Sequence, residues 1–343
     1  MACSRKSASA DGRAGVAPAG GISPPIFRVF ALNYTPPASP TFRLPVGDGH
    51  ELYVETVGKR GGRAAVYLHG GPGSGCLPIH RSLFDPNRHY AVLFDQRGAG
   101  RSTPSGSREA NTTPHLIADM EAIREHLGID RWLVVGGSGG ATLAIAYAEA
   151  HPDRVSGIVL RAAFLGTANE LDWAFGAALR TFYPALHEDF LSLLPEVERA
   201  DPLRHYFARI LDPDPAIHGP AARAYAATED ALAGIRPARS RLDFTAISNP
   251  AARIPATAFM EAHYFSHDCW LAPDQLMAET PRLAGIPGII VQGRYDLLCP
   301  PSTSHALAAA WGGAIVRMIE AAGHALTEAG VQAAVTAAIS ELT

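Results

Sequence analysis

The sequence predicts an α/β fold built on a mostly parallel, eight-stranded sheet, with a helical cap domain inserted into it. Short apolar segments of strand length alternate with helical patterns, and this alternation is typical of a parallel sheet covered on both faces. Between residues 165 and 270 the alternation stops, and helical pieces broken by prolines replace it. We therefore expect a core made of residues 41–164 and 271–343, with a helical cap at 165–270 inserted after the sixth strand.

The composition fits a globular protein and excludes several classes. The chain has 343 residues, of which 47% are hydrophobic and 18% are charged, as in one large α/β domain with an insertion or in two domains. The net charge of −4 without a basic stripe argues against a nucleic-acid partner. No run of 18 apolar residues occurs, so we expect no membrane span. Four separated cysteines and the lack of any metal-binding spacing predict no metal, no cofactor and a reducing, cytoplasmic compartment.

The first half of the core contains most of the predicted elements. We expect strands at 51–57, 64–68, 90–94, 132–135 and 155–160, and helices at 112–127 and 141–150. The first of these strands alternates in polarity, whereas the others are continuous apolar runs. The first helix has one apolar face, made of Leu116, Met120, Ile123 and Leu127.

The two remaining regions flank this half. Residues 1–40 are rich in Ala, Gly, Ser and Pro without an apolar segment after Arg5-Lys6, which predicts a flexible extension instead of a signal peptide. The insertion carries 14 acidic residues against nine arginines, so we expect an acidic lid over the carboxyl edge of the sheet. Beyond it we expect strands at 289–292 and 314–319, and helices at 302–311 and 327–342.

A glycine-rich turn at residues 136–140 carries the most specific chemical signal. Its sequence G-G-S-G-G fits the pattern G-x-S-x-G and lies between a buried strand and an apolar helix. A sharp turn there lifts a serine above the sheet edge, and the next N–H points at the developing oxyanion. Ser138 is therefore the predicted nucleophile, and Gly139 is a predicted oxyanion donor. Taken alone, the motif is also compatible with a phosphate-binding loop.

A second glycine-rich turn, H-G-G-P-G at residues 69–73, follows an earlier strand. The backbone N–H of Gly71 is the predicted second oxyanion donor. A dinucleotide site is the competing interpretation, since Asp95 ends the next strand about 20 residues further on. We disfavour it because no helical pattern begins at Gly73 and residues 76–78 would break one.

Two further residues at strand ends complete a catalytic set. Asp296 follows the strand at 289–292, and an acid there orients an imidazole and stabilises its charged form. His324 follows the strand at 314–319. Alone, the first could be a capping aspartate and the second an ordinary loop histidine. Together with Ser138 they occur in the chain order Ser, Asp, His at strand ends, which matches an α/β-hydrolase triad.

These motifs resemble the proline iminopeptidases of the α/β-hydrolase superfamily over roughly residues 40–343. The resemblance is most specific at H-G-G-P-G (69–73), D-Q-R-G-x-G-R-S (95–102) and G-R-Y-D (293–296). Residues 261–265 resemble the family's E-x-H-Y-F segment. The resemblance implies serine-dependent release of an N-terminal residue, often proline, from short peptides or amides. It implies that Glu261 binds the free amine of the substrate, and it suggests Glu229 as a second acid for that amine.

The sequence departs from the family pattern at one functional position. Proline iminopeptidases usually have tryptophan after the nucleophile, where this chain has Gly139. Any residue except proline supplies the backbone N–H, but the wall that an indole would form is missing. We therefore expect an altered acyl pocket and a less certain preference for proline.

Other classes of function stay open at this point. An esterase, thioesterase or metabolite-tailoring hydrolase on the same scaffold is favoured by Gly139 and opposed by Glu261. A non-catalytic binding protein that retains the fold is opposed by the complete triad. The expected partner is a small molecule or short peptide, and the sequence does not set the oligomeric state. Arg97 and Arg101 are predicted to be structural, and Cys299 is predicted to be a packed thiol.

Overall fold

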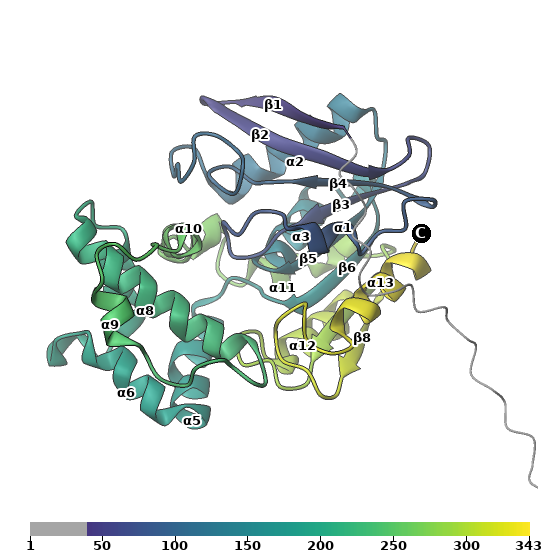
Figure 1. Cartoon of the computed structure of the whole chain (residues 1–343). Coiled ribbons are helices and arrows are strands. Elements are labelled where there is room, and N and C mark those ends of the chain that lie inside the picture. The colour runs from purple at the N-terminus through teal and green to yellow at the C-terminus, as the bar shows by residue number, and fades with distance from the viewer. Residues whose placement is uncertain (1–39) are drawn as a thin grey trace, which may run out of the picture. The chain divides into compact units, whose positions relative to one another are not determined.

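The computed structural model describes residues 40–343, so the predicted extension over residues 1–40 lies almost entirely outside the described residues. The described part contains one eight-stranded sheet in the order β1-β2-β4-β3-β5-β6-β7-β8 (Figure 1). The strands are β1 (Thr41–Gly47), β2 (His50–Gly58), β3 (Arg63–Leu68), β4 (His89–Phe94), β5 (Trp132–Ser138), β6 (Val155–Ala163), β7 (Gly288–Gly293) and β8 (Ala314–Ile319). Strand β2 pairs antiparallel with β1 and β4, and every other neighbouring pair is parallel. The predicted mostly parallel sheet is confirmed.

Strand β1 is the one strand of this sheet that the sequence pattern does not locate. Its residues alternate between exposed and half-buried positions, so it lacks the buried apolar run that marks the central strands. A turn at Asp48 and Gly49, both with positive φ, connects it to β2 as an edge hairpin. The edge position explains why its composition is mixed.

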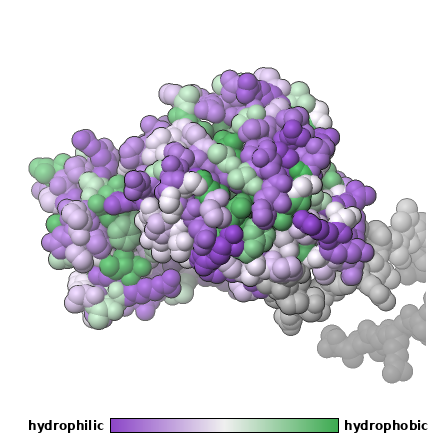
Figure 2. Space-filling view, turned by 90° about the horizontal axis from the view of Figure 1, so that it is seen from above, coloured by the Kyte–Doolittle hydropathy of each residue, from purple (hydrophilic) through white to green (hydrophobic). Residues whose placement is uncertain are grey.

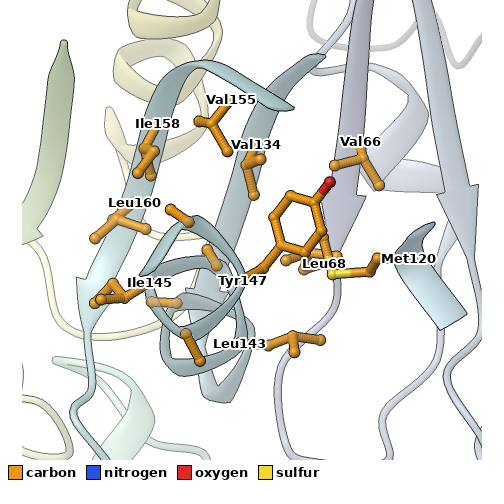
Figure 3. Packing of buried hydrophobic residues seen from close by; sticks show 14 of the residues in the cluster. Val66, Leu68, Met120, Val134, Leu143, Ile145, Tyr147, Val155, Ile158 and Leu160 are labelled. Carbon is orange, nitrogen blue, oxygen red and sulfur yellow. The ribbon is translucent and has the colours of Figure 1, made fainter. Parts of the chain in front are cut away.

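Helices cover both faces of the sheet. The core helices are α1 (Pro78–Arg81), α2 (Thr113–Leu127), α3 (Gly139–Ala150), α12 (Pro301–Trp311) and α13 (Val331–Glu341). On β3, Val66 and Leu68 face the cluster built with α2, α3 and α12, while Ala65 and Tyr67 face the cluster built with α13. Figure 3 shows the first cluster, in which Tyr147 packs between its helix and the strands. Burial of both faces explains the continuous apolar strands of the sequence.

The last helix is shorter than predicted. It begins at Val331 and not at residue 327, because Gly330 precedes it in the left-handed region with φ of 85°. A residue in that conformation cannot continue a right-handed helix. Residues 327–330 therefore belong to the loop that follows β8, which also contains His324.

A helical segment lies between β6 and β7 and has a hydrophobic core of its own. Its helices are α4 (Ala168–Asp172), α5 (Leu179–Phe182), α6 (Pro184–Ser192), α7 (Pro202–Ile210), α8 (Pro215–Ala233), α9 (Phe244–Ser248) and α10 (Ala256–Phe265). Helix α11 (Gln275–Ala278) follows this segment and contributes Leu276 to the core of the sheet, next to α3. Phe190 and Tyr206 stack with ring centroids 4.0 Å apart at the centre of this core. In Figure 1, α5, α6, α8 and α9 lie to one side of the sheet, and α10 lies closer to it.

Figure 2 shows hydrophilic residues over most of one face, with small hydrophobic patches among them. No helix in the described part of the chain is both long and apolar enough to cross a membrane.

Two arginines hold the loop that follows β4, as predicted. The Arg97 guanidinium donates to both carboxylate oxygens of Asp119 at 2.8 and 2.9 Å and to Asp48 at 3.0 Å. Arg101 donates to Asp95 at 2.7 Å and to Glu55 at 3.3 Å. The loop is therefore fixed by ion pairs to the sheet and to α2.

Replacing Arg97 with methionine is expected to lower the free energy of unfolding by about 3–5 kcal/mol, because the carboxylate of Asp119 would stay buried without its partner. Both side chains of this pair are almost fully buried, at 2% and 1% exposure. Urea denaturation measures the effect. The matched control is Arg294→Met, whose exposed pair with Glu320 is expected to contribute about 0–1 kcal/mol. Equal losses in the two variants would contradict the structural role of Arg97.

Candidate active site

Ser138 occupies a strained turn between β5 and α3. Its φ and ψ are 56° and −126°, which is rare for a residue with a side chain and is typical of a strand-to-helix nucleophile turn. A Cβ at Gly136 would lie 2.2 Å from the carbonyl oxygen of Gly140, and a Cβ at Gly140 would lie 2.2 Å from that of Leu68. The turn therefore needs glycine at both positions, and the sequence supplies it.

Asp296 and His324 are in direct contact. Nδ1 of His324 lies 2.9 Å from Oδ2 and 3.1 Å from Oδ1 of Asp296. Since a carboxylate only accepts, the neutral imidazole donates from Nδ1, which leaves Nε2 as the basic nitrogen. The carboxylate also accepts from the backbone N–H groups of Leu298 and Cys299 at 3.0 and 2.8 Å. Both side chains of the pair are buried.

Arg161, on β6, lies beside the turn and contacts the histidine loop, and sequence reasoning did not find it. A Cβ at Gly137 would lie 2.7 Å from its Nε, and its guanidinium donates to the carbonyl oxygen of His324. Arg161 therefore lies against the turn of Ser138 and is hydrogen-bonded to the backbone of His324. No direct hydrogen bond joins these two described residues, and such bonds often shorten only when substrate is present.

The loop at residues 69–73 lies over the serine turn. A Cβ at Gly70 would lie 3.4 Å from the Cβ of Ser138. His69 holds the loop from behind, because its Nε2 accepts the backbone N–H of Gln96 at 3.0 Å and its Nδ1 lies 3.0 Å from the carbonyl oxygen of Gly70. Burial lowers the pKa of His69, so the ring stays neutral and keeps this pattern.

Gly139 is in close contact with that loop, which changes the interpretation of the missing tryptophan. A Cβ at Gly139 would lie 2.4 Å from the carbonyl oxygen of Gly71 and 2.9 Å from its carbonyl carbon. The neighbouring cavity, lined by Phe164, Tyr264 and Phe265 among others, has a volume of only about 20 Å³, close to the space of one water molecule. The space where a side chain at position 139 would begin is therefore filled by the backbone of Gly71.

Gly139→Ala is accordingly expected to lower kcat on esters and on aminoacyl arylamides by a similar factor of roughly 10–100, because the new methyl group displaces the loop that carries Gly71. The substrate ranking should stay the same. Rates on one ester and one arylamide measure this. Gly176→Ala is the control, since a Cβ there would meet nothing within 4 Å. A change in ranking without a common loss in kcat would show that Gly139 acts as a pocket wall.

Glu261 and Glu229 form an acidic pair in the helical segment, in which Glu261 is buried and Glu229 is half-buried. Glu261, on α10, is 2% exposed, and its Oε2 has no hydrogen-bond partner. Its Oε1 lies 3.7 Å from the place where a Cβ of Gly71 would be, so the acid adjoins the loop over Ser138. Burial and the neighbouring Glu229 raise the pKa of Glu261 well above its usual range, while the hydroxyl of Tyr225 lowers it. Burial raises the pKa of Glu229, on α8, to about 7.

This pair has no cation of its own. Neither carboxyl group takes part in a salt bridge with any described residue. Buried acids without a counter-charge tend to hold a proton or to bind a cationic group. The arrangement can therefore receive one positive charge close to the serine turn. The hydroxyl of Tyr225 is the third polar group of this arrangement, next to Glu261. No local sequence pattern marks Tyr225 as a site residue.

The remaining chemistry-bearing side chains have simpler environments. Cys299 is buried beside Asp296, and burial raises the pKa of its thiol well above the ordinary value, as expected for a packed thiol. Over residues 40–343, no three His, Cys, Asp or Glu side chains gather in an arrangement that suits a metal ion.

Comparison with known proteins defines the class first. Residues 66–330 match the family described as alpha/beta hydrolase fold, which confirms the predicted fold. A proline iminopeptidase-related protein from Thermus thermophilus has a similar structure, with a TM-score of 0.57 and 21% sequence identity over 89% of this chain and 98% of that chain.

The relatives then define the family. The chain is 39% identical to a probable proline iminopeptidase of Leptolyngbya boryana, over 85% of this chain and 90% of that protein. It is 42% identical to a proline iminopeptidase of Arabidopsis thaliana, over 84% of this chain and 76% of that protein. The chain therefore belongs to the proline iminopeptidase family of the α/β hydrolases. The prediction of a hydrolase enzyme of this family is confirmed.

Proposed function

We propose that this protein is a serine aminopeptidase that releases the N-terminal residue of short peptides and aminoacyl amides. The observation that carries this proposal is the acidic pair Glu261 and Glu229, whose buried member Glu261 adjoins the loop over Ser138 and which has no cation of its own. A carboxylate in that place attracts the protonated amine of a substrate whose first carbonyl lies at the serine. The relatives are named proline iminopeptidases, which favours proline as the released residue.

In the proposed mechanism Ser138 is the nucleophile. Its Oγ attacks the first carbonyl carbon, and Nε2 of His324 takes its proton, while Asp296 holds Nδ1 and stabilises the charged ring. The backbone N–H groups of Gly71 and Gly139 stabilise the oxyanion. The histidine then gives the proton to the leaving amine, and an acyl-enzyme remains. Water attacks the ester carbonyl, His324 takes the water proton, and return of that proton to Oγ frees the amino acid.

The acidic pair explains why one residue is removed at a time. Glu261 lies beside the loop at residues 69–73. An ammonium group bound to Glu261 is therefore held near the reacting carbonyl, and an α-aminoacyl group has its amine and its carbonyl close together in this way. An ammonium group held there belongs to the same residue as the carbonyl at Ser138, so we expect the release of one residue at a time. We propose that the helical segment at 165–270 acts as a cap that supplies this acid.

We also propose that the protein works in the reducing cytoplasm. The thiols of Cys76, Cys269 and Cys299 are free in the structure, as is usual for cysteines of a reducing compartment.

A substrate panel tests the proposed function. Proline, alanine and other aminoacyl arylamides are compared with simple p-nitrophenyl esters under the same conditions. The proposal expects the arylamides to be cleaved, with kcat/KM highest for proline or another small apolar residue. Cleavage of the esters without any cleavage of the arylamides would assign the protein to the esterases instead.

A further inference from the structure

We propose that Glu328 is a positioning residue that fastens the loop of His324 to the end of helix α8. The inference rests on the proposed function, because it assigns His324 the role of general base. It concerns four residues at the junction of the helical segment with the last loop of the core, which we call the α8 latch: Ala233, Ile235, Gly323 and Glu328.

The latch consists of backbone hydrogen bonds and one shared carboxylate. The N–H groups of His324 and Ala325 both donate to the carbonyl oxygen of Ala233, each at 2.9 Å. Ala233 is the last residue of α8, and helix ends leave such carbonyl groups without a partner inside the helix. Glu328 contributes the second link: its Oε1 accepts the N–H of Ile235 at 3.3 Å, and its Oε2 accepts the N–H of Gly323 at 3.4 Å.

The contact surfaces are close enough to fix the loop. A Cβ at Gly323 would lie 3.1 Å from the carbonyl oxygen of Ala233, and a Cβ at Gly234 would lie 3.1 Å from Oε1 of Glu328. On its other side the His324 carbonyl accepts from Arg161 of β6. The backbone of the histidine is thus held between the sheet and the helical segment, while Asp296 holds only its ring.

The same helix carries part of the acidic pair. Glu229 precedes Ala233 by four residues, or about one helical turn of 5.4 Å. One rigid element therefore connects the place proposed for the substrate amine with the backbone of the general base. A displacement of α8 would move both, so the histidine reaches its working position only while the end of α8 rests on its loop.

The test compares Glu328→Ala with Glu328→Gln and with the control Glu320→Ala, an exposed acid near the latch that pairs only with Arg294. For Glu328→Ala we expect kcat to fall roughly tenfold on both an aminoacyl arylamide and an uncharged ester, with KM within about twofold of its normal value. Reaction of Ser138 with a fluorophosphonate should slow by the same factor. Glu328→Gln keeps one acceptor, so its kcat should lie between that of Glu328→Ala and that of the unmodified protein. The control Glu320→Ala should have the kcat of the unmodified protein.

Hydrogen exchange supplies a readout that does not depend on activity. In Glu328→Ala, segments 225–235 and 320–328 should exchange faster together, with the melting temperature of the whole protein almost unchanged. Should this variant fold poorly, Gly234→Leu displaces the same carboxylate and should give the same pattern. Unchanged kcat, a loss confined to KM on charged substrates, or faster exchange in only one of the two segments overturns the proposal. Failure of the proposed function would appear separately, as full activity of Ser138→Ala.

Discussion

Ser138→Ala is expected to lower kcat by roughly 10⁴-fold or more on every substrate, because the variant loses the atom that forms the acyl-enzyme. Ser138 lies in a turn that few side chains tolerate, and the loop at residues 69–73 covers it. Steady-state rates on a proline arylamide and on a p-nitrophenyl ester measure the loss. Thermal unfolding should show that the variant is folded.

A covalent probe separates loss of the nucleophile from other causes. A fluorophosphonate should label the protein without a substitution at one site, with loss of fluoride and formation of a phosphonate ester at Oγ of Ser138. It should not label the Ser138→Ala variant. Ser302→Ala, which removes an exposed hydroxyl from α12, is the matched control and should keep full activity. Near-normal turnover by Ser138→Ala would exclude the proposed mechanism.

Glu261→Gln is expected to lower kcat/KM for aminoacyl arylamides by a free energy of about 2–5 kcal/mol, since the ammonium group of the substrate would lose its charged partner in a dry site. Uncharged esters should change little, because they reach Ser138 without this contact. The side chain is buried, and its Oε2 has no partner in the structure. The glutamine variant keeps the size and removes only the charge.

The matched control for this variant is Glu196→Gln. Glu196 is an exposed acid of the same helical segment, so its loss changes the net charge equally without touching the acidic pair. It should leave both substrate types unchanged, apart from a small effect at low salt. Equal losses on arylamides and esters in Glu261→Gln would mean that the acid is structural.

The sequence predicts the sheet and the triad because both depend on local patterns. A strand buried on two faces needs a continuous apolar run, and a nucleophile turn needs small residues around one serine. A short stretch of sequence is therefore enough to predict both β5 and Ser138. Asp296 and His324 follow strands of the same kind, and parallel strands bring their carboxyl ends to one edge. The edge strand β1 has neither pattern, so the sequence does not locate it.

The sequence does not predict contacts between distant segments that share no local signal. The approach of Gly71 to Gly139 is one example: the sequence suggested a lost pocket wall, whereas the structure has backbone in that space. The hydrogen bond from the N–H of His324 to the carbonyl oxygen of Ala233 is another, since it joins positions 91 residues apart. Such contacts follow from how the helical segment packs, and packing is set by the whole fold and not by a motif.

The most direct test of an aminopeptidase that recognises a free amine is the cleavage of one arylamide in two forms. L-proline p-nitroanilide is compared with its N-acetyl derivative, which keeps the acyl group and the leaving group and removes the charge. If the acidic pair around Glu261 binds the ammonium group, kcat/KM should be lower for the acetylated form by on the order of 10²–10³-fold. Equal cleavage of the two forms would contradict the proposed binding of the ammonium group, because it is the result expected of a serine hydrolase without a site for the amine.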